Sequence, residues 1–296
     1  MSCASSWPIT KQRGCCMGEK ISVMVPYYKE DGAQVRTLLQ SLPMNMLHEV
    51  AVVDDGGNGS IKDFLPPGVK YYRHDENVGP TGNYNRCIEH ATGDLVHIMH
   101  ADDVVQVAFY IGITGLAQKW PDCAFYGTQH FHMQEGNNQV FVPAYQFFLF
   151  TPTDDPTTLY YGNAFAASAC VIRRSFFAKH GYYNEKLVHV ADWEMWVRAI
   201  RFGGGVYLPA PLVTYLTSSR NHTTHLAMTG DNFRDTLQLA PIFEEYGGDK
   251  FDKRKFYETV LASTEAQAKG LEAAGLKDAA KHNRKLAHEI KGRLNG

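Results

Sequence analysis

Hydrophobic positions in the first hundred residues follow two alternating periods. Short apolar runs of strand length, each bounded by turn residues, lie at 21–25, 50–53, 69–72 and 95–99. Between them, apolar residues recur at i, i+3, i+4 and i+7, the spacing of one helix face, at 35–42 and again at 84–91. Strands that alternate with helices through short connections predict a mostly parallel sheet flanked by helices. We therefore expect an α/β fold that begins at Ile21.

The pattern is less regular in the second half of the chain. Residues 123–133 and 139–148 alternate loosely and are rich in aromatics, which fits antiparallel strands or a flap. Strands are expected at 169–172, 206–208 and 212–216, a helix at 193–200 and a polar loop at 218–225. The pattern is helical from Phe233 onward. These boundaries predict a disordered lead at 1–19, one α/β domain at 20–230 and a helical C-terminal extension at 231–296.

Polar residues follow three of the predicted strands, at the point where each strand ends. They are Pro26, Tyr27 and Tyr28, then Asp54 and Asp55, then His100, Ala101, Asp102 and Asp103. Ligands of open α/β sheets bind at the carboxyl ends of strands. Because neighbouring carboxylates repel one another unless a cation lies between them, the last pair is a candidate metal site for a phosphorylated ligand. An isolated acidic pair is more often a solvated loop, and it is the convergence of three strand ends that favours a site.

Composition excludes several classes of protein. The chain has 296 residues, 44% hydrophobic and 20% charged, with a net charge of −2, so nothing favours nucleic acid as a partner. Its six cysteines lack the spacing of a zinc site or a disulfide framework. No signal-peptide core or membrane-spanning run is present, so we expect a cytoplasmic protein. The basic run at 277–293 is typical of a solvated helix face, with peripheral membrane contact as the sharper alternative.

In their order along the chain, these motifs resemble those of glycosyltransferase family 2. That family contains nucleotide-sugar-dependent enzymes of the GT-A fold, a Rossmann-like, mostly parallel sheet flanked by helices. Several ordered motifs within about residues 21–225 carry the resemblance, which makes it more specific than any one of them. They are the opening strand through Tyr28, Val52 to Gly56, Asn77 with Gly79, Asn85, Ala91 with Gly93, Ala101 to Asp103, Gly181 to Glu185, and Asp192 with Glu194. The sequence departs from the family at His100 and Ala191, which stand where the family has the first acid of its metal-binding and catalytic motifs.

The resemblance implies an inverting, metal-dependent transfer of a sugar from a nucleotide-diphosphate donor to a hydroxyl of a glycan or lipid-linked acceptor, as in polysaccharide biosynthesis. Asp102, with Asp103 and His222, would hold Mn²⁺ or Mg²⁺ at the diphosphate. Asp192 would be the catalytic base, with Glu194 as the alternative. The residues expected at the donor are Pro26, Tyr28, Glu30, Asp54, Asp55, Asn77, Gly79, Asn85, His100, Ala101 and Asp102.

Side-chain chemistry adds detail to the two substrates. Tyr28 offers a flat face to a nucleobase, and Asp54 or Asp55 can accept from an imide or a ribose, which favours UDP as the nucleotide. Aromatic residues near Asn163 either stack on the acceptor sugar or pack in the core; they are Tyr160, Tyr161 and Phe165.

Other functions stay open on the residues alone. A nucleotidyltransferase would need a Gly-rich phosphate loop after the first strand, where this chain has the segment 27–32 with a single glycine. The substitutions at His100 and Ala191 fit a non-catalytic nucleotide-sugar-binding protein. A zinc hydrolase rests only on the number of histidines, namely His130, His132, His222 and His225. The sugar, the acceptor, the linkage and the oligomeric state are not encoded in any pattern that we can identify.

Overall fold

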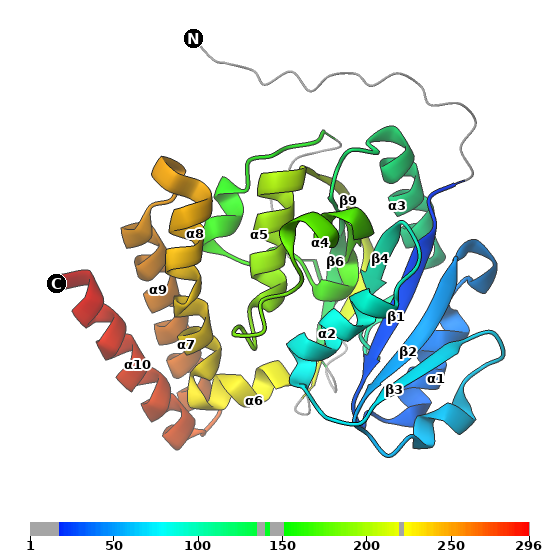
Figure 1. Ribbon diagram of the computed structural model, residues 1–296. Coiled ribbons are helices and arrows are strands. Elements are labelled where there is room, and N and C mark those ends of the chain that lie inside the picture. Colours follow the sequence, from blue (N-terminus) through cyan, green and yellow to red (C-terminus); the bar gives the residue numbers. More distant parts are fainter. Residues whose placement is uncertain (1–17, 135–139, 143–150, 219–221, 296) are drawn as a thin grey trace, which may run out of the picture.

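The computed structural model describes residues 18–134, 140–142, 151–218 and 222–295. Its centre is a mixed β-sheet (Figure 1). Its strands are β1 (Ile21–Tyr27), β2 (Glu49–Asp55), β3 (Lys70–His74), β4 (Leu95–Ile98), β5 (Val104–Val105), β6 (Phe125–Gln134), β7 (Val140–Phe141), β8 (Cys170–Arg173) and β9 (Gly205–Thr217). They are arranged in the order β3-β2-β1-β4-β8-β6-β9-β5, with β7 paired to β6. β1 is parallel to β2 and β4, and β2 is parallel to β3. Parallel pairing therefore dominates the first half of the sheet, as the sequence predicts.

Helices cover both faces of this sheet and continue beyond it. They are α1 (Gly32–Ser41), α2 (Gly79–His90), α3 (Val107–Lys119), α4 (Arg174–His180), α5 (Ala191–Gly203), α6 (His222–Thr229), α7 (Asp231–Leu237), α8 (Leu239–Gly247), α9 (Lys253–Ala273) and α10 (Lys277–Asn295). Asp31 caps α1 by accepting a hydrogen bond from the Ala33 N–H, and Val35, Leu38 and Leu39 bury its apolar face. The helices α1, α2 and α5 lie where the hydrophobic periodicity predicts them, whereas α3 has no counterpart among the predicted elements.

The carboxyl ends of three parallel strands meet at one edge of the sheet. Tyr27 on β1 is opposite Asp54 on β2, and Met24 on β1 is opposite Ile98 on β4. The polar segments that follow these strands are therefore brought together, as the sequence predicts. This edge is the carboxyl-end location at which α/β sheets bind ligands.

The second half of the sheet contains both parallel and antiparallel pairs, and two predictions for the second half of the chain are wrong in their boundaries. β9 is one long strand parallel to β6, although we expected two strands at 206–208 and 212–216. Its prolines, Pro209 and Pro211, lie where the β6–β9 register shifts. Proline has no N–H for a regular ladder, and the irregularity in the pairing accommodates both residues. The expected loop at 218–225 is helical from His222, where α6 begins.

The C-terminal helices pack against the α/β part of the chain. Figure 1 shows α7 to α10 stacked beside α5, on the side away from β1, β2 and β3. Trp193 of α5 contacts Phe243 of α8 and Phe256 of α9, with ring centroids 5.7 Å and 6.5 Å apart. One hydrophobic cluster thus includes residues on both sides of the predicted boundary at 230. That boundary, like the lead at 1–19, stays a prediction, and residues 1–17 lie outside the described ranges.

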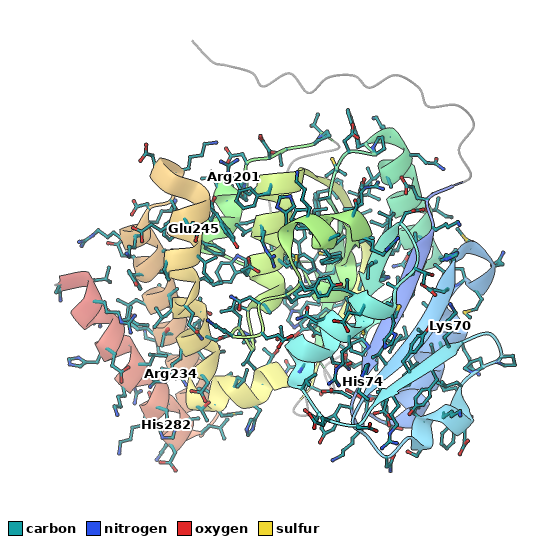
Figure 2. The ribbon with its side chains drawn as sticks, in the orientation of Figure 1. Lys70, His74, Arg201, Arg234, Glu245 and His282 are labelled. Carbon is teal, nitrogen blue, oxygen red and sulfur yellow. The ribbon has the colours of Figure 1, made fainter. Side chains whose placement is uncertain are left out.

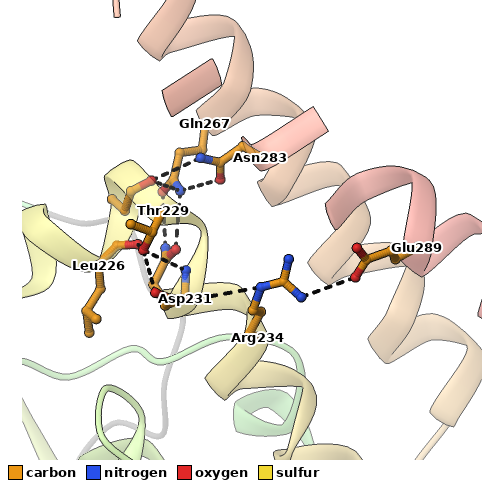
Figure 3. Close-up of polar contacts among 9 residues, drawn as sticks. Leu226, Thr229, Asp231, Arg234, Gln267, Asn283 and Glu289 are labelled. Carbon is orange, nitrogen blue, oxygen red and sulfur yellow. Dashed lines mark hydrogen bonds and ion pairs between the residues drawn. The ribbon is translucent and has the colours of Figure 1, made fainter. Parts of the chain in front are cut away.

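Polar contacts join the C-terminal helices to one another (Figure 3). The Gln267 side chain of α9 donates to the Asn283 oxygen of α10 at 2.8 Å, and Asn283 donates to the Ala227 carbonyl of α6 at 3.0 Å. Arg234 of α7 pairs with Glu289 of α10 at 3.2 Å. Figure 2 places Arg234 and His282 on these helices, at the opposite end of the molecule from Lys70 and His74 on β3. Across the described ranges, no helix combines the length and apolar character needed to cross a bilayer.

Candidate active site

A cavity of about 1520 Å³ opens at the carboxyl edge of the sheet. It is lined by the segments after β1, β2 and β4, by the starts of α2 and α5, and by the end of β9. Residues of α7 and α9 also line it, and these helices lie on the side of the molecule away from β1 and β2 (Figure 1). Its size suits a ligand as large as a nucleotide sugar together with a second substrate.

The segment after β1 forms one wall of this cavity. Pro26, Tyr28 and Glu30, all expected at the donor, line it. Tyr28 is 41% exposed, so its ring is accessible to a ligand. The Glu30 carboxylate accepts a hydrogen bond from the Tyr28 N–H, which fixes this turn, and burial raises the pKa of Glu30.

The two aspartates at the end of β2 have different surroundings. Asp55 lines the cavity and accepts hydrogen bonds from the Val78 and Gly79 N–H groups, both at 3.0 Å, and pairs with Arg86 at 3.1 Å. It thereby holds the N-terminus of α2, where exposed N–H groups favour an anion. Asp54 is fully buried outside the cavity lining, where it accepts from the Gly57 N–H at 2.8 Å and the Tyr71 hydroxyl at 2.7 Å.

The start of α2 contributes further residues expected at the donor. Asn77 and Gly79 line the cavity, and the Asn77 side chain accepts from the Gly79 N–H at 2.9 Å. Gly79 has φ 80°, in the left-handed region that disfavours other residues. Asn85 lies outside the lining. Its side chain accepts from the Tyr183 N–H at 2.8 Å and donates to the Tyr183 carbonyl at 3.1 Å, so it connects α2 to the segment before α5.

The residues after β4 form a cluster with metal-ligand chemistry. Ligand atoms of His100, Asp102 and Asp103 all lie within 4.8 Å of one another, and no other group of this kind occurs in the described ranges. His100, Ala101 and Asp102 line the cavity. The Tyr84 hydroxyl lies 2.8 Å from His100 Nε2, which orients the ring. One nitrogen and two carboxylates fit a divalent cation such as Mn²⁺, while Mg²⁺ prefers oxygen ligands alone.

Asp103 lies behind the cavity wall. It is 2% exposed and accepts from the Ser168 hydroxyl at 2.6 Å and from the Leu216 N–H at 3.0 Å. Burial and the neighbouring Asp102 charge raise the pKa of Asp103 to about 8. Asp103 thus connects the end of β4 with β9. The side chain of His222, the third residue expected at the metal, lies outside the described part of the structure.

Asp192 lines the cavity in the first turn of α5. Its carboxylate accepts from the Asn163 side chain at 3.2 Å and from the Trp193 N–H at 2.6 Å. Burial raises the pKa of Asp192 to about 6. Asp235 of α7 fixes the approach to this turn by accepting from the His189 and Val190 N–H groups, at 2.6 Å and 3.0 Å. The carboxylate is therefore held in place and is a stronger base than an exposed aspartate.

Glu194, the alternative base, lies outside the residues that line the cavity. It is 1% exposed, pairs with Arg198 at 2.9 Å and accepts from the Tyr246 hydroxyl of α8 at 2.7 Å. Arg198 also donates to the Tyr182 carbonyl at 2.7 Å. Glu194 thus anchors α5 to α8 and to the segment before α5.

Other residues of the cavity have roles that the sequence patterns leave open. Of the aromatic group near Asn163, Tyr161 and Phe165 line the cavity, whereas Tyr160 is buried in the core. His130 and His132 line it as well, but within the described ranges they form no metal cluster. Residues on the C-terminal helices complete the lining, namely Phe233, Thr236, Thr259, Val260 and Ser263. Hydroxyl and apolar residues at helical spacing are common on any amphipathic helix, so no sequence signal singled them out.

Comparisons with known proteins agree with this geometry. The family model for glycosyl transferase family 2 matches residues 22–181. An uncharacterised protein of Mycobacterium tuberculosis (strain CDC 1551 / Oshkosh), MT1568, is 33% identical over 89 residues, which are 28% of each chain. Among solved structures, S. aureus TarS 1–349 with UDP-GlcNAc superposes with a TM-score of 0.59 at 14% identity, over 89% of both chains. The same protein with UDP gives a TM-score of 0.52 at 15% identity, again over 89% of both chains.

Proposed function

The chain belongs to glycosyl transferase family 2, and we propose that it transfers a sugar from a nucleotide-diphosphate donor to a hydroxyl of a glycan or lipid-linked acceptor, with inversion of configuration. Its fold is the predicted GT-A fold with additional C-terminal helices. One observation carries the proposal: His100 and Asp102 of the candidate metal cluster line the same cavity as Asp192, a partly buried carboxylate of raised pKa. Because TarS binds UDP-GlcNAc and UDP, we propose UDP as the nucleotide.

The donor would occupy the side of the cavity formed by the segments after β1 and β2. Tyr28 offers an exposed ring on which the base can stack, and Asp55, which lines the cavity, can accept a hydrogen bond from a ribose hydroxyl. Asp54 and Asn85 act behind this wall by holding the turns that form it.

Charge on the cavity wall supports metal dependence. Among the described residues that line it, Lys29 is the one lysine or arginine. A diphosphate leaving group carries more negative charge than one ammonium can neutralise. His100 and Asp102, with Asp103 behind them, would hold a divalent cation, which when bound supplies the missing positive charge. The imidazole of His100 favours Mn²⁺ over Mg²⁺.

Asp192 would remove the proton of the acceptor hydroxyl as that oxygen attacks the anomeric carbon. With a pKa of about 6, it is ionised near neutral pH and still basic enough to take the proton. Asn163 and the Trp193 N–H hold the carboxylate in one orientation, as a general base requires. A single displacement by the acceptor, with no carboxylate acting as nucleophile, inverts the anomeric centre.

Thermal denaturation with nucleotide diphosphates tests this proposal. We expect UDP to raise the melting temperature only when Mn²⁺ or Mg²⁺ is present, because a ligand at a hundred times its Kd adds about 2.7 kcal/mol of stability. Asp102→Ala should lose this metal-dependent stabilisation. Asp249→Ala, at an exposed position after α8, is the matched control and should keep it. Stabilisation by UDP without metal would refute metal dependence, and no response to any nucleotide diphosphate would refute the donor site.

A further inference from the structure

The side of the cavity opposite the predicted donor site is built partly by the C-terminal helices, beyond the residues that the family model matches. We call this surface the α7–α9 wall; it comprises Phe233, Thr236, Thr259, Val260 and Ser263. We propose that the α7–α9 wall binds the acceptor and that the acceptor is an uncharged carbohydrate. This inference rests on the proposed function and adds the substrate class of its second site.

The α7–α9 wall is directly connected to the predicted catalytic base. Asp235 of α7 holds the His189 and Val190 N–H groups, and Val190 immediately precedes α5, in whose first turn Asp192 lies. Thr236, the next residue of α7, lines the cavity. A ligand that lies along this surface therefore lies beside the segment that carries Asp192.

The side chains of the α7–α9 wall match the chemistry of a sugar. Thr259 and Ser263 are four residues apart on α9, so they project from the same helix face. Thr236 and Thr259 donate their hydroxyl protons to the carbonyls of Asn232 and Lys255, both at 2.9 Å, which leaves lone pairs to accept from a ligand hydroxyl. Phe233, and Tyr161 beside the start of α9, add aromatic surface for the apolar face of a pyranose.

The charge of this region distinguishes between classes of acceptor. Among the described residues of α7 and α9 that line the cavity there is no lysine or arginine, and Lys255 of α9, which lies over the Tyr161 ring at 4.2 Å, is outside the lining. A phosphate bound away from the candidate metal cluster would need arginine or lysine to compensate for its lost hydration. A phosphorylated acceptor would also approach the ionised Asp192 carboxylate. A neutral polyhydroxylated acceptor meets neither penalty.

A pair of tryptophan substitutions on α9 tests this inference. Ser263→Trp places a large side chain on the α7–α9 wall at an exposed position. Ala262→Trp is the size-matched control, because Ala262 is also exposed but does not line the cavity. The acceptor probes are neutral p-nitrophenyl pyranosides and, as the anionic alternative, glycerol phosphate oligomers, each assayed with UDP-sugars and Mn²⁺. We expect transfer to at least one neutral glycoside, with its KM raised roughly tenfold or more by Ser263→Trp, a change of about 1.4 kcal/mol in binding. Ala262→Trp should behave as the wild-type chain.

Two further measurements separate this inference from the proposed function. Ser263→Trp should keep metal-dependent UDP binding, because the α7–α9 wall lies opposite the donor side. Thr259→Val, which keeps the shape and removes the hydroxyl, should raise the KM for the same glycoside by roughly two- to tenfold. Three outcomes would overturn the inference while UDP binding persists. They are transfer only to glycerol phosphate oligomers, no transfer to any neutral glycoside, and a KM for the neutral glycoside that is the same in Ser263→Trp as in the wild-type chain. If the wild-type chain does not bind UDP, the proposed function is refuted, and so is the inference that rests on it.

Discussion

At the scale of single residues, Asp192 is the position where structure and chemistry agree most closely. Asp192→Asn keeps the volume of the side chain and one of its two acceptor oxygens, and it removes the basicity of the carboxylate. We expect turnover to fall by at least roughly a hundredfold with UDP binding retained, because general-base catalysis contributes factors of this order. In the wild-type chain, kcat should rise with pH through about 6 and then level off as the carboxylate ionises. Transfer assays from about pH 5 to 8 measure both effects, and turnover near the wild-type level in the variant would assign the base elsewhere.

The same residue should reveal a conflict between stability and activity. Burial raises the pKa of Asp192 from 3.8 to about 6, so the folded state binds this proton more tightly than the unfolded chain does. Its contribution to stability is therefore greatest below about pH 4 and declines as pH rises through about 6. Asp192→Asn should be more resistant to urea than the wild-type chain near neutral pH, with a smaller difference at low pH. Equal resistance at all pH values would mean that the carboxylate is not held in the surroundings described above.

The sequence motifs surround one cavity, but they do not distinguish the residues that line it from those behind its wall. Asp102 and Asp192 line the cavity, as a ligand-binding motif leads us to expect. Asp54, Asn85 and Glu194 belong to the same motifs, yet each is engaged by backbone or side-chain groups of its own chain. A motif includes residues that shape a site as well as residues that touch the ligand, because loss of either disrupts it. Only the three-dimensional contacts distinguish the two groups.

At the scale of elements, a buried glutamate at the other edge of the sheet joins three strands and the segment after α2. Glu49 of β2 accepts from the Ser22 hydroxyl of β1 at 2.5 Å, from the Thr92 N–H at 2.6 Å and from Lys70 of β3 at 2.6 Å. Although burial opposes ionisation, these donors lower the pKa of Glu49 to about 2. The ionised carboxylate thus stabilises the alignment of strands whose opposite ends form the cavity.

Glu49→Gln should therefore destabilise the chain by roughly 1–3 kcal/mol near neutral pH, because buried donors lose a charged acceptor. A depressed pKa gives stability that is present above about pH 4.5 and is lost as pH falls toward about 2. The difference between variant and wild type should shrink over that range. Lys70→Met, at a half-exposed position, should cost less because the Ser22 and Thr92 donors remain. Chemical denaturation at several pH values measures these differences, and a variant as stable as the wild-type chain would show that the carboxylate contributes nothing.

Element prediction succeeded where hydrophobic periodicity was strong and local. β1, β2, β4, α1 and α2 lie close to their predicted positions because one apolar face or run determines each of them. β9 is one strand where the apolar pattern predicts two, because pairing with β6 includes an irregularity that accommodates Pro209 and Pro211. The start of α6 is polar, and its helical state depends on packing that a sequence pattern does not record.

At the scale of the whole molecule, the C-terminal helices complete both the core and the cavity. Phe243 and Phe256 are fully buried against Trp193, and residues of α7 and α9 line the cavity. The sequence pattern predicts these helices but not their part in the cavity. An amphipathic face shows that a helix packs against another surface, but it does not show which surface. The hydrophobic pattern did not determine the contacts between segments far apart in the sequence, such as those of α5 with α8 and α9.

This arrangement predicts that the segment 20–230 does not fold by itself. A chain that ends at Gly230 would expose Trp193 and the surface under α8 and α9, and would lose the Asp235 contacts at the start of α5. We expect it to aggregate or to lack a cooperative thermal transition. Phe256→Ala in the full chain is the milder test; it should cost about 3–5 kcal/mol, as large-to-small substitutions in cores do. Lys269→Ala, exposed on the same helix, is its control. A truncated chain that unfolds cooperatively and binds UDP with metal would instead make residues 231–296 an independent appendage, and the α7–α9 wall would then have to be tested as a separate unit.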